Sequence, residues 1–269
     1  MVAKSGGPDE PQIQWYPGHM AQAMRKLAER LRVVDAIIEV RDARLPDASA
    51  NPALDQLAAR KPRVVVLGCE DLADPHLTRE WLAWLAAHGR TAVAVNGKDQ
   101  TSVRRIAAAL NNVAAGGAMR AMVVGIPNTG KSSIINGLVR RTAARAEDKA
   151  GVTRSLQWFR VGPKLELMDT PGILVPKIAT PQARWQLALT GALPRERFDA
   201  EAVIAEFVAW SRAHAPERAV PDLAAFAELR GFAQRGGGFD VHNAAGAFLK
   251  GFGEGKFGRF TFERPAGSA

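Results

Sequence analysis

The feature that most constrains this chain is a complete Gly-x-x-x-x-Gly-Lys-Ser pattern from Gly125 to Ser132. A valine-rich apolar run precedes it, and a segment with helical spacing follows it. Glycines let backbone N–H groups curl around a chain of phosphates, lysine can reach the outer phosphates, and the serine hydroxyl can bind magnesium. The pattern therefore predicts a strand, a loop and a helix that bind a nucleoside phosphate. The predicted contact residues are Asn128, Thr129, Gly130, Lys131, Ser132 and Ser133.

Apolar runs alternate with helical patterns on both sides of this loop. The runs predict strands over 33–40, 64–67, 91–95, 121–124, 156–161 and 165–168. Helical spacing predicts helices over 50–60, 77–88 and 102–113. Strands that alternate with helices form a mainly parallel sheet covered on both faces, with ligands at the carboxyl ends of the strands. The predicted fold class is thus an α/β P-loop domain.

The pattern changes near Pro181, where β-branched runs end and helical spacing takes over. Helices are predicted over 184–190, 200–214, 223–230 and 241–252. This shift predicts two domains, a nucleotide-binding domain with an N-terminal helix over 1–180 and a small all-helical domain over 181–269.

The last predicted helix runs into a stretch where cations alternate with five phenylalanines. We expect the phenylalanines to fill the core rather than to stack on bases. The cations are better candidates for contacts with RNA phosphates. They are Lys250, Lys256, Arg259 and Arg264.

Charge and composition narrow the partners. The chain has 269 residues, a formal net charge of +9 and a sequence pI near 10.2, which favours a polyanionic partner. No apolar run approaches the roughly 18 residues of a membrane span, so we expect a soluble protein with no membrane partner. One cysteine, Cys69, excludes an internal disulfide and a cysteine-based zinc cluster. These features, with no sign of a targeting segment, predict a cytoplasmic protein.

Two further segments offer magnesium ligands. In "KLELMDTPGILVPK", Asp169 ends an apolar run, where a carboxylate beside the phosphate loop can hold magnesium through water, and the N–H of Gly172 can sense a γ-phosphate. In the polar segment before it, the hydroxyl of Thr153 would complete magnesium coordination together with Ser132. An ordinary Pro-Gly turn and a strand cap at Thr153 are the alternatives.

Two candidate base-reading loops precede the phosphate loop. Gly68, Cys69, Glu70 and Asp71 follow the second predicted strand, at the place where a guanine-binding fold has Asn-Lys-x-Asp. A second loop begins at Asn96 and Gly97. In an ordinary GTPase the phosphate loop comes first and the base reader last. If these loops form one site, the domain is circularly permuted, with its joint at 114–118.

Several segments together resemble one family: "IQWYPGHMAQAMRKL", "GIPNTGKSSIINGL", "GVTRSLQW", "DTPGILVPK", "ALTGAL" and "GKFGRFTFE". They are similar to the circularly permuted bacterial ribosome-assembly GTPases of the YlqF/RbgA family, in the family's order, from Gln14 to Glu263. The resemblance implies that the chain binds GTP or GDP with Mg²⁺ and hydrolyses GTP. It also implies a late role in maturing the large ribosomal subunit, in which a helical C-terminal domain helps to bind ribosomal RNA.

The resemblance also implies catalytic residues. Many GTPases place a glutamine after Asp-Thr-Pro-Gly to orient the attacking water, but this chain has Ile173, which cannot hydrogen-bond water. The family points instead to His19, whose imidazole can orient or deprotonate water, alongside Lys131 and Thr153 at the phosphates. The alternative is that His19 only caps or packs the N-terminal helix. Asn128 could help hold a potassium ion, as in related GTPases, or only stabilise its loop.

The base-reading loop is where the chain departs from its family. In Asn-Lys-x-Asp, the Asp accepts from guanine N1–H and N2–H, the Asn ties the loops together, and the Lys stem covers the ring. Asp71 is kept, whereas Gly68 and Cys69 replace the other two, so we predict a kept guanine preference and weaker affinity. Lys98 in "VNGKD" lies one position late and is not expected to compensate. Asn96 and Gly97 would contact the guanine oxygen.

Other functions remain open at this stage. The chain could be an RNA-binding assembly factor that keeps nucleotide only as a structural ligand, with little turnover. An ATPase or a nucleotide kinase would share the phosphate loop, but neither explains Asp-Thr-Pro-Gly or "WYPGHM". We expect a monomer.

Overall fold

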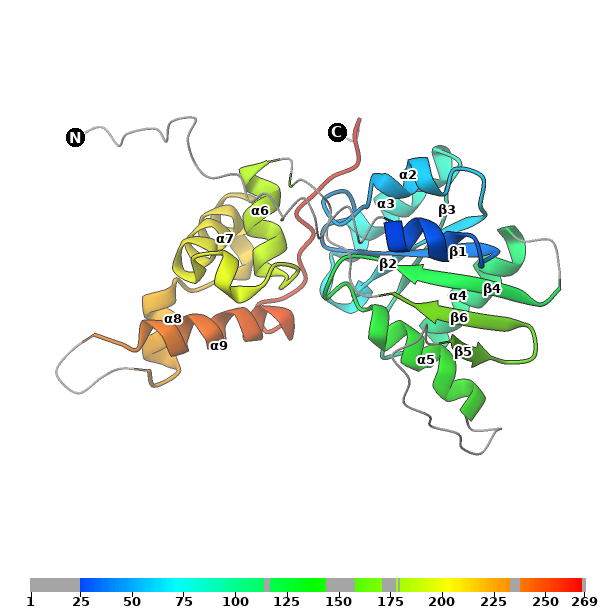
Figure 1. Ribbon diagram of the computed structural model, residues 1–269. Helices are drawn as coiled ribbons and strands as arrows, with labels where there is room; N and C mark the ends of the chain where they lie inside the picture. Colours follow the sequence, from blue (N-terminus) through cyan, green and yellow to red (C-terminus); the bar gives the residue numbers. More distant parts are fainter. Residues whose placement is uncertain are drawn as a thin grey trace.

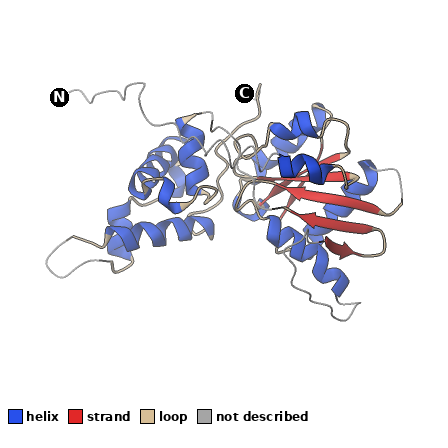
Figure 2. Cartoon of the chain, in the orientation of Figure 1, coloured by secondary structure: helices blue, strands red, loops and turns tan. Residues whose placement is uncertain are grey.

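The computed structural model describes residues 25–113, 117–143, 158–170, 178, 180–232 and 238–267. Two parts lie beside each other (Figure 1): a sheet with helices on both faces, and a group of helices. All strands belong to the first part, as the red arrows of Figure 2 show. We call the first part the sheet domain and the second part the helical region.

Within the described residues, the sheet domain contains six strands in the order β3-β2-β1-β4-β6-β5. The strands are β1 (Ala36–Asp42), β2 (Arg63–Gly68), β3 (Thr91–Val95), β4 (Met119–Val124), β5 (Trp158–Val161) and β6 (Leu165–Asp169). Every neighbouring pair is parallel except β5 and β6. The predicted mainly parallel sheet is therefore confirmed. Because β1 lies between β2 and β4, the loops that follow those two strands leave the same edge on either side of β1.

Helices cover both faces of the sheet. They are α2 (Ala53–Leu57), α3 (Pro75–Ala87), α4 (Gln100–Val113) and α5 (Lys131–Ala143). On one face, α4 and α5 bury Ile106 and Ile134 against β1, β2 and β4. On the other face, α2, α3 and helical residues 25–31 contribute Leu54, Trp81 and Leu27. Burial of these apolar side chains on both faces fixes the sheet and hence the edge that its loops share.

Some boundaries differ from the sequence prediction. Strand β1 begins at Ala36 rather than at residue 33, since Val33 lies in a turn and is 47% exposed. The helix expected over 50–60 spans only Ala53–Leu57, and Pro52 provides no side-chain cap for it. In contrast, α3 starts two residues early because the Asp74 carboxylate accepts hydrogen bonds from two backbone N–H groups of its first turn.

The helical region packs around phenylalanine. It contains α6 (Pro181–Leu189), α7 (Ala200–His214), α8 (Leu223–Leu229) and α9 (Val241–Gly253). Phe207 is fully buried and lies edge-on to Phe248, Phe252, Phe260 and Phe262. The prediction that the C-terminal phenylalanines fill the core is confirmed. Within the described ranges, no helix has the length and apolarity needed to cross a membrane.

The C-terminal segment, residues 259–264, leaves the helical region and runs along the sheet domain (red in Figure 1). The N–H groups of Phe260 and Phe262 donate to the carbonyls of Leu72 (3.0 Å) and Arg44 (2.9 Å). The Trp81 indole N–H donates to the carbonyl of Glu263 at 3.0 Å. These bonds tie the end of the chain to the loops that follow β1 and β2 and to helix α3.

Candidate nucleotide-binding site

The phosphate loop connects β4 to α5 at the carboxyl edge of the sheet. It lies against the backbone of β1, since a Cβ at Gly125 would lie 2.3 Å from the carbonyl oxygen of Val40. The Thr129 hydroxyl donates to the carbonyl of Ile126 at 3.0 Å, and the Lys131 ammonium donates to the same carbonyl at 2.6 Å. The loop thus curls at the N-terminus of a helix, where N–H groups and the helix dipole favour an anion.

Lys131 of the phosphate loop and Asp169 of the neighbouring strand β6 are the charged residues of this part of the site. Asp169 ends β6 and pairs in register with Val123 of β4. Burial lowers the pKa of Lys131 to about 8, against the opposing effect of Asp169. Burial also raises the pKa of Asp169, against the opposing effect of Lys131. Burial disfavours the charged form of each group, so Lys131 would gain from a phosphate and Asp169 from a cation.

The described residues fit a magnesium ion on the phosphate chain. Ser132 is exposed in the first turn of α5, and Asp169 is half-buried at the end of β6. Hydroxyl and carboxylate oxygens are ligands that magnesium accepts. The neighbouring Thr170 hydroxyl donates to the carbonyl of Val123 at 2.6 Å, which holds this strand end in place. The predicted residues His19, Thr153 and Gly172 lie outside the described ranges.

The first candidate base-reading loop packs directly on the phosphate loop. Strand β2 ends at Gly68, where a Cβ would lie 2.3 Å from the carbonyl oxygen of Thr129. Cys69 follows in the left-handed conformation, with φ 57°, and its sulfur lies 3.6 Å from where a Cβ would stand on Gly130. Without a Cβ at Gly68 the two loops approach backbone to backbone. An asparagine here, as in the family pattern, requires one of the loops to move.

The second candidate loop, after β3, packs on α5. A Cβ at Gly97 would lie 2.8 Å from Cβ of Ser133. Asn96 accepts from the N–H of Lys98 through Oδ1 at 2.9 Å, and its own N–H donates to the Ser102 hydroxyl at 2.9 Å. The structure therefore places both predicted base-reading loops against the phosphate loop or the helix that follows it.

Lys98 is the residue that sequence reasoning placed outside the site. Its ammonium lies 3.9 Å from Oδ2 of Asp71. The neighbouring Glu70 carboxylate faces away toward α4, where it pairs with Arg105 at 3.2 Å. The motif position of Lys98 gave no sign of this contact, because the contact depends on how two loops from different strands meet.

The helical region also reaches the phosphate loop. The Asn128 side-chain N–H group donates to the carbonyl of Gly191, in the "ALTGAL" segment, at 2.5 Å. Between the two parts lies a cavity of about 460 Å³, lined by Asn128 and Cys69 on one side and by Arg195 on the other. Arg44 also lines it and is held in the core by an ion pair with Asp42 at 2.7 Å. The phosphate loop and the first base-reading loop thus border the helical region.

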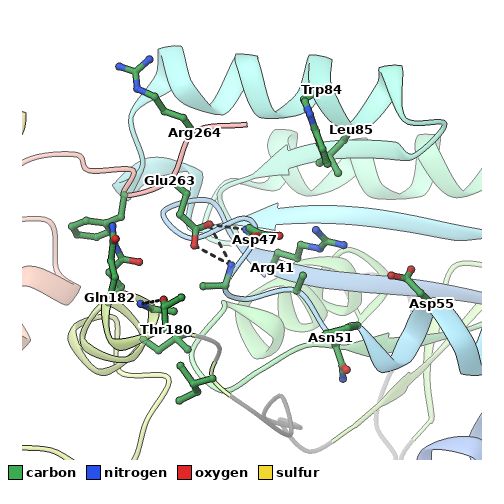
Figure 3. Close-up of a pocket in the computed structure, with 18 of the residues that line it drawn as sticks. Arg41, Asp47, Asn51, Asp55, Trp84, Leu85, Thr180, Gln182, Glu263 and Arg264 are labelled. Carbon is green, nitrogen blue, oxygen red and sulfur yellow. Dashed lines mark hydrogen bonds between the residues drawn. The ribbon is translucent and has the colours of Figure 1, made fainter. Parts of the chain in front are cut away.

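A larger cavity of about 860 Å³ is lined in part by Glu263 and Arg264 of the C-terminal segment (Figure 3). Glu263 points into it and accepts from the N–H groups of Asp47 (2.7 Å) and Ala48 (3.0 Å). Burial raises the pKa of Glu263 to about 7, although both N–H donors favour its ionised form. Ile178 and Thr180, which follow the Asp-Thr-Pro-Gly segment, also line this cavity.

Fold and site together define a P-loop nucleotide-binding protein of the GTPase class. The family model "50S ribosome-binding GTPase" matches residues 120–212. The "Ribosome biogenesis GTPase A" of Bacillus cereus is 37% identical, and the match covers 94% of each chain. That of Thermotoga maritima is 32% identical, over 94% of this chain and 95% of the relative. The chain belongs to the ribosome biogenesis GTPase A family.

Solved structures agree with the sequence relatives. A GNP-bound YlqF from T. maritima is 28% identical and superimposes with a TM-score of 0.73, over 91% of this chain and 99% of that one. A GDP-bound structure of the same protein gives 30% identity and a TM-score of 0.71, over 90% and 99%. The likeness therefore extends across both the sheet domain and the helical region.

Proposed function

We propose that this protein is a GTPase that acts late in assembly of the large ribosomal subunit. GTP favours docking on the precursor subunit, and hydrolysis to GDP promotes release. The observation that carries this proposal is the meeting of the phosphate loop, both base-reading loops and the helical region at one edge of the sheet. The bond from Asn128 to Gly191 joins the phosphate loop to the helical region, so nucleotide state can influence how that region is held.

The domain is proposed to be circularly permuted. Both base-reading loops precede the phosphate loop along the chain, yet they pack on it or on the helix that it begins. The proposed boundary lies near Pro181, the first residue of α6. This order places the Asp-Thr-Pro-Gly segment directly before the helical region, where a change at the γ-phosphate has a short path to α6.

The proposed roles at the phosphates follow from residue chemistry. Lys131 neutralises the outer phosphates, and the Ser132 hydroxyl, the Thr153 hydroxyl and the Asp169 carboxylate hold Mg²⁺. The backbone N–H of Gly172 senses the γ-phosphate. Magnesium, when bound, neutralises charge that develops on the phosphates during hydrolysis.

His19 is proposed to orient the attacking water, because Ile173 cannot. The test is the ribosome-stimulated turnover of a His19→Ala protein, with His76→Ala as the control. His76 is an exposed histidine on α3 that pairs with Glu80 at 3.0 Å. We expect a large loss of turnover for His19→Ala alone. Full turnover of that variant would remove the catalytic role.

Asn128 is proposed to contribute to a potassium site through its side-chain oxygen. Its N–H group is engaged by Gly191, so only the oxygen is offered to a cation. Turnover measured in potassium and in sodium buffers tests this role. Equal rates would leave Asn128 as a link to the helical region only.

The proposed partner is the precursor of the large ribosomal subunit. The protein is proposed to bind it as a monomer in the cytoplasm. The net charge of +9 favours RNA, and the exposed lysines Lys250 and Lys256 of the helical region are candidates for phosphate contacts, together with Arg259 and Arg264. Binding should therefore weaken steeply as salt rises.

One experiment separates this proposal from an RNA-binding factor with a structural nucleotide. Single-turnover GTP hydrolysis is measured with and without purified large subunits. We expect subunits to accelerate hydrolysis. Binding to subunits without any acceleration would favour the structural role, for which the altered base-reading loop and Ile173 leave room.

A further inference from the structure

Lys98 stands beside the base-reading loop although it belongs to the neighbouring loop. Its ammonium is 3.9 Å from Oδ2 of Asp71, the carboxylate predicted to read the base. It is also close enough to the Cys69 thiol and to the Glu254 carboxylate of the helical region to act on both electrostatically. Its ammonium therefore lies beside the loop in which the family pattern has a lysine.

The backbone of Lys98 is fixed, whereas its side chain is free to move. Its N–H donates to the Asn96 side chain at 2.9 Å, and Gly97 beside it packs on Ser133 of α5. The side chain itself is 79% exposed. A residue with a fixed backbone and an exposed, flexible side chain is suited to lie across a bound ligand.

Cys69, which stands where the family pattern has a lysine, cannot cover a bound base. Cys69 is short, and burial raises the pKa of its thiol to about 12, so it carries no charge at neutral pH. Gly68 has no side chain at all. If Asp71 binds the edge of a purine, a side chain other than those of Gly68 and Cys69 must therefore pack against the face of its ring.

Building on the proposed binding of guanine nucleotide, we infer that Lys98 replaces the missing lysine and covers the guanine ring with its stem. Without a nucleotide, the Lys98 ammonium pairs with the Asp71 carboxylate. An exposed ion pair of this kind is weak, so it opens at little cost when the N–H groups of the base take over the carboxylate. The stem and ammonium then lie over the face of the ring, where apolar contact and cation–π attraction favour them.

Three variants test the inference: Lys98→Ala, Lys98→Met and the control Lys164→Ala. Methionine keeps an apolar stem of similar length without the charge. Lys164 is exposed in the turn between β5 and β6, at the edge of the sheet opposite the loops. Dissociation constants for GDP and ADP are measured by calorimetry with magnesium present, and melting temperatures check that each variant folds.

We expect Lys98→Ala to bind GDP about three- to fivefold more weakly, the size of losing about one buried methylene group of the stem that covers the ring. Lys98→Met should stay within about twofold of the unmodified protein, since apolar contact provides most of the cover. Lys164→Ala should bind GDP as the unmodified protein does. Weak ADP binding should barely change in any variant, because Asp71 does not hold adenine under the stem.

Two results would overturn the inference. One is Lys98→Ala binding GDP as tightly as the unmodified protein, or more tightly, which would make Lys98 a bystander or a competitor of the base. The other is an equal loss of GDP affinity for Lys98→Met and Lys98→Ala, which would show that the effect comes from the charge of Lys98 acting on Asp71 and not from its stem. If the unmodified protein itself binds ADP as tightly as GDP, the proposed guanine recognition fails first, and that outcome is distinct from both.

Discussion

In the phosphate-binding half of the site, the loop keeps every residue that its chemistry requires, and Lys131 and Asp169 are close enough to interact electrostatically. In the base-binding half, only Asp71 of the family's three named residues is kept, and Gly68 and Cys69 pack on the phosphate loop through backbone and thiol. The comparison teaches that phosphate binding needs specific side chains at specific places. Under the proposed function, base reading relies on contacts that neighbouring loops supply in place of the two lost residues.

The helical region touches the two halves differently. It reaches the phosphate half through the single described hydrogen bond from Asn128 to Gly191. On the base half, the C-terminal segment bonds to the backbone of Leu72, directly after Asp71, and Arg218 pairs with Asp74 at 3.2 Å. The chain segment that follows Asp71 is therefore bonded directly to the helical region and the C-terminal segment.

The largest effect is expected in the phosphate half. Lys131→Ala should weaken GDP binding about ten- to a hundredfold, the cost of one hydrogen bond to a charged group. Calorimetry measures the dissociation constant, with Lys164→Ala as the control. A loss below about threefold, less than even a weak bond of this kind, would mean that the loop does not hold the phosphates through Lys131.

The contact between the two halves should be sensitive to volume. Gly68→Ala should destabilise the folded protein by about 1–3 kcal/mol, because the added methyl group would sit 2.3 Å from the Thr129 carbonyl. Urea unfolding measures this, and GDP affinity should fall with it. Gly246→Ala is the matched control, since its Cβ meets nothing within 4 Å and alanine favours its helix. Equal stability of the two variants would show that the loops are not in close contact.

The attachment of the C-terminal segment to the residues that follow β1 should depend on pH. The pKa of Glu263 rises from 4.5 to about 7 on folding, so between these values the folded protein binds more protons than the unfolded chain. The free energy of unfolding should therefore fall by about 1–2 kcal/mol as pH rises from roughly 5 to 7. Glu263→Gln cannot titrate and should lose this part of the slope. The same slope in both proteins would exclude Glu263 as its source.

The sequence predicted the regular elements better than the contacts between them. The bounds of β3 and α7 follow from local spacing and were predicted to the residue. The phosphate loop was predicted because its pattern lies within eight consecutive residues. The approach of Lys98 to Asp71 and the return of Phe262 to Arg44 join distant parts of the chain, and no local pattern encodes such contacts.

The central claim is that Asp71 still reads guanine in a loop that has lost its other two named residues. Competition against labelled GDP, with GTP, XTP and ATP, tests it on the unmodified protein and on Asp71→Asn. Guanine offers N–H groups to a carboxylate, whereas xanthine has a carbonyl at C2, which accepts from an asparagine N–H. The account predicts that the unmodified protein prefers GTP over XTP and ATP, and that Asp71→Asn prefers XTP. An unchanged order of affinities in the variant would contradict it.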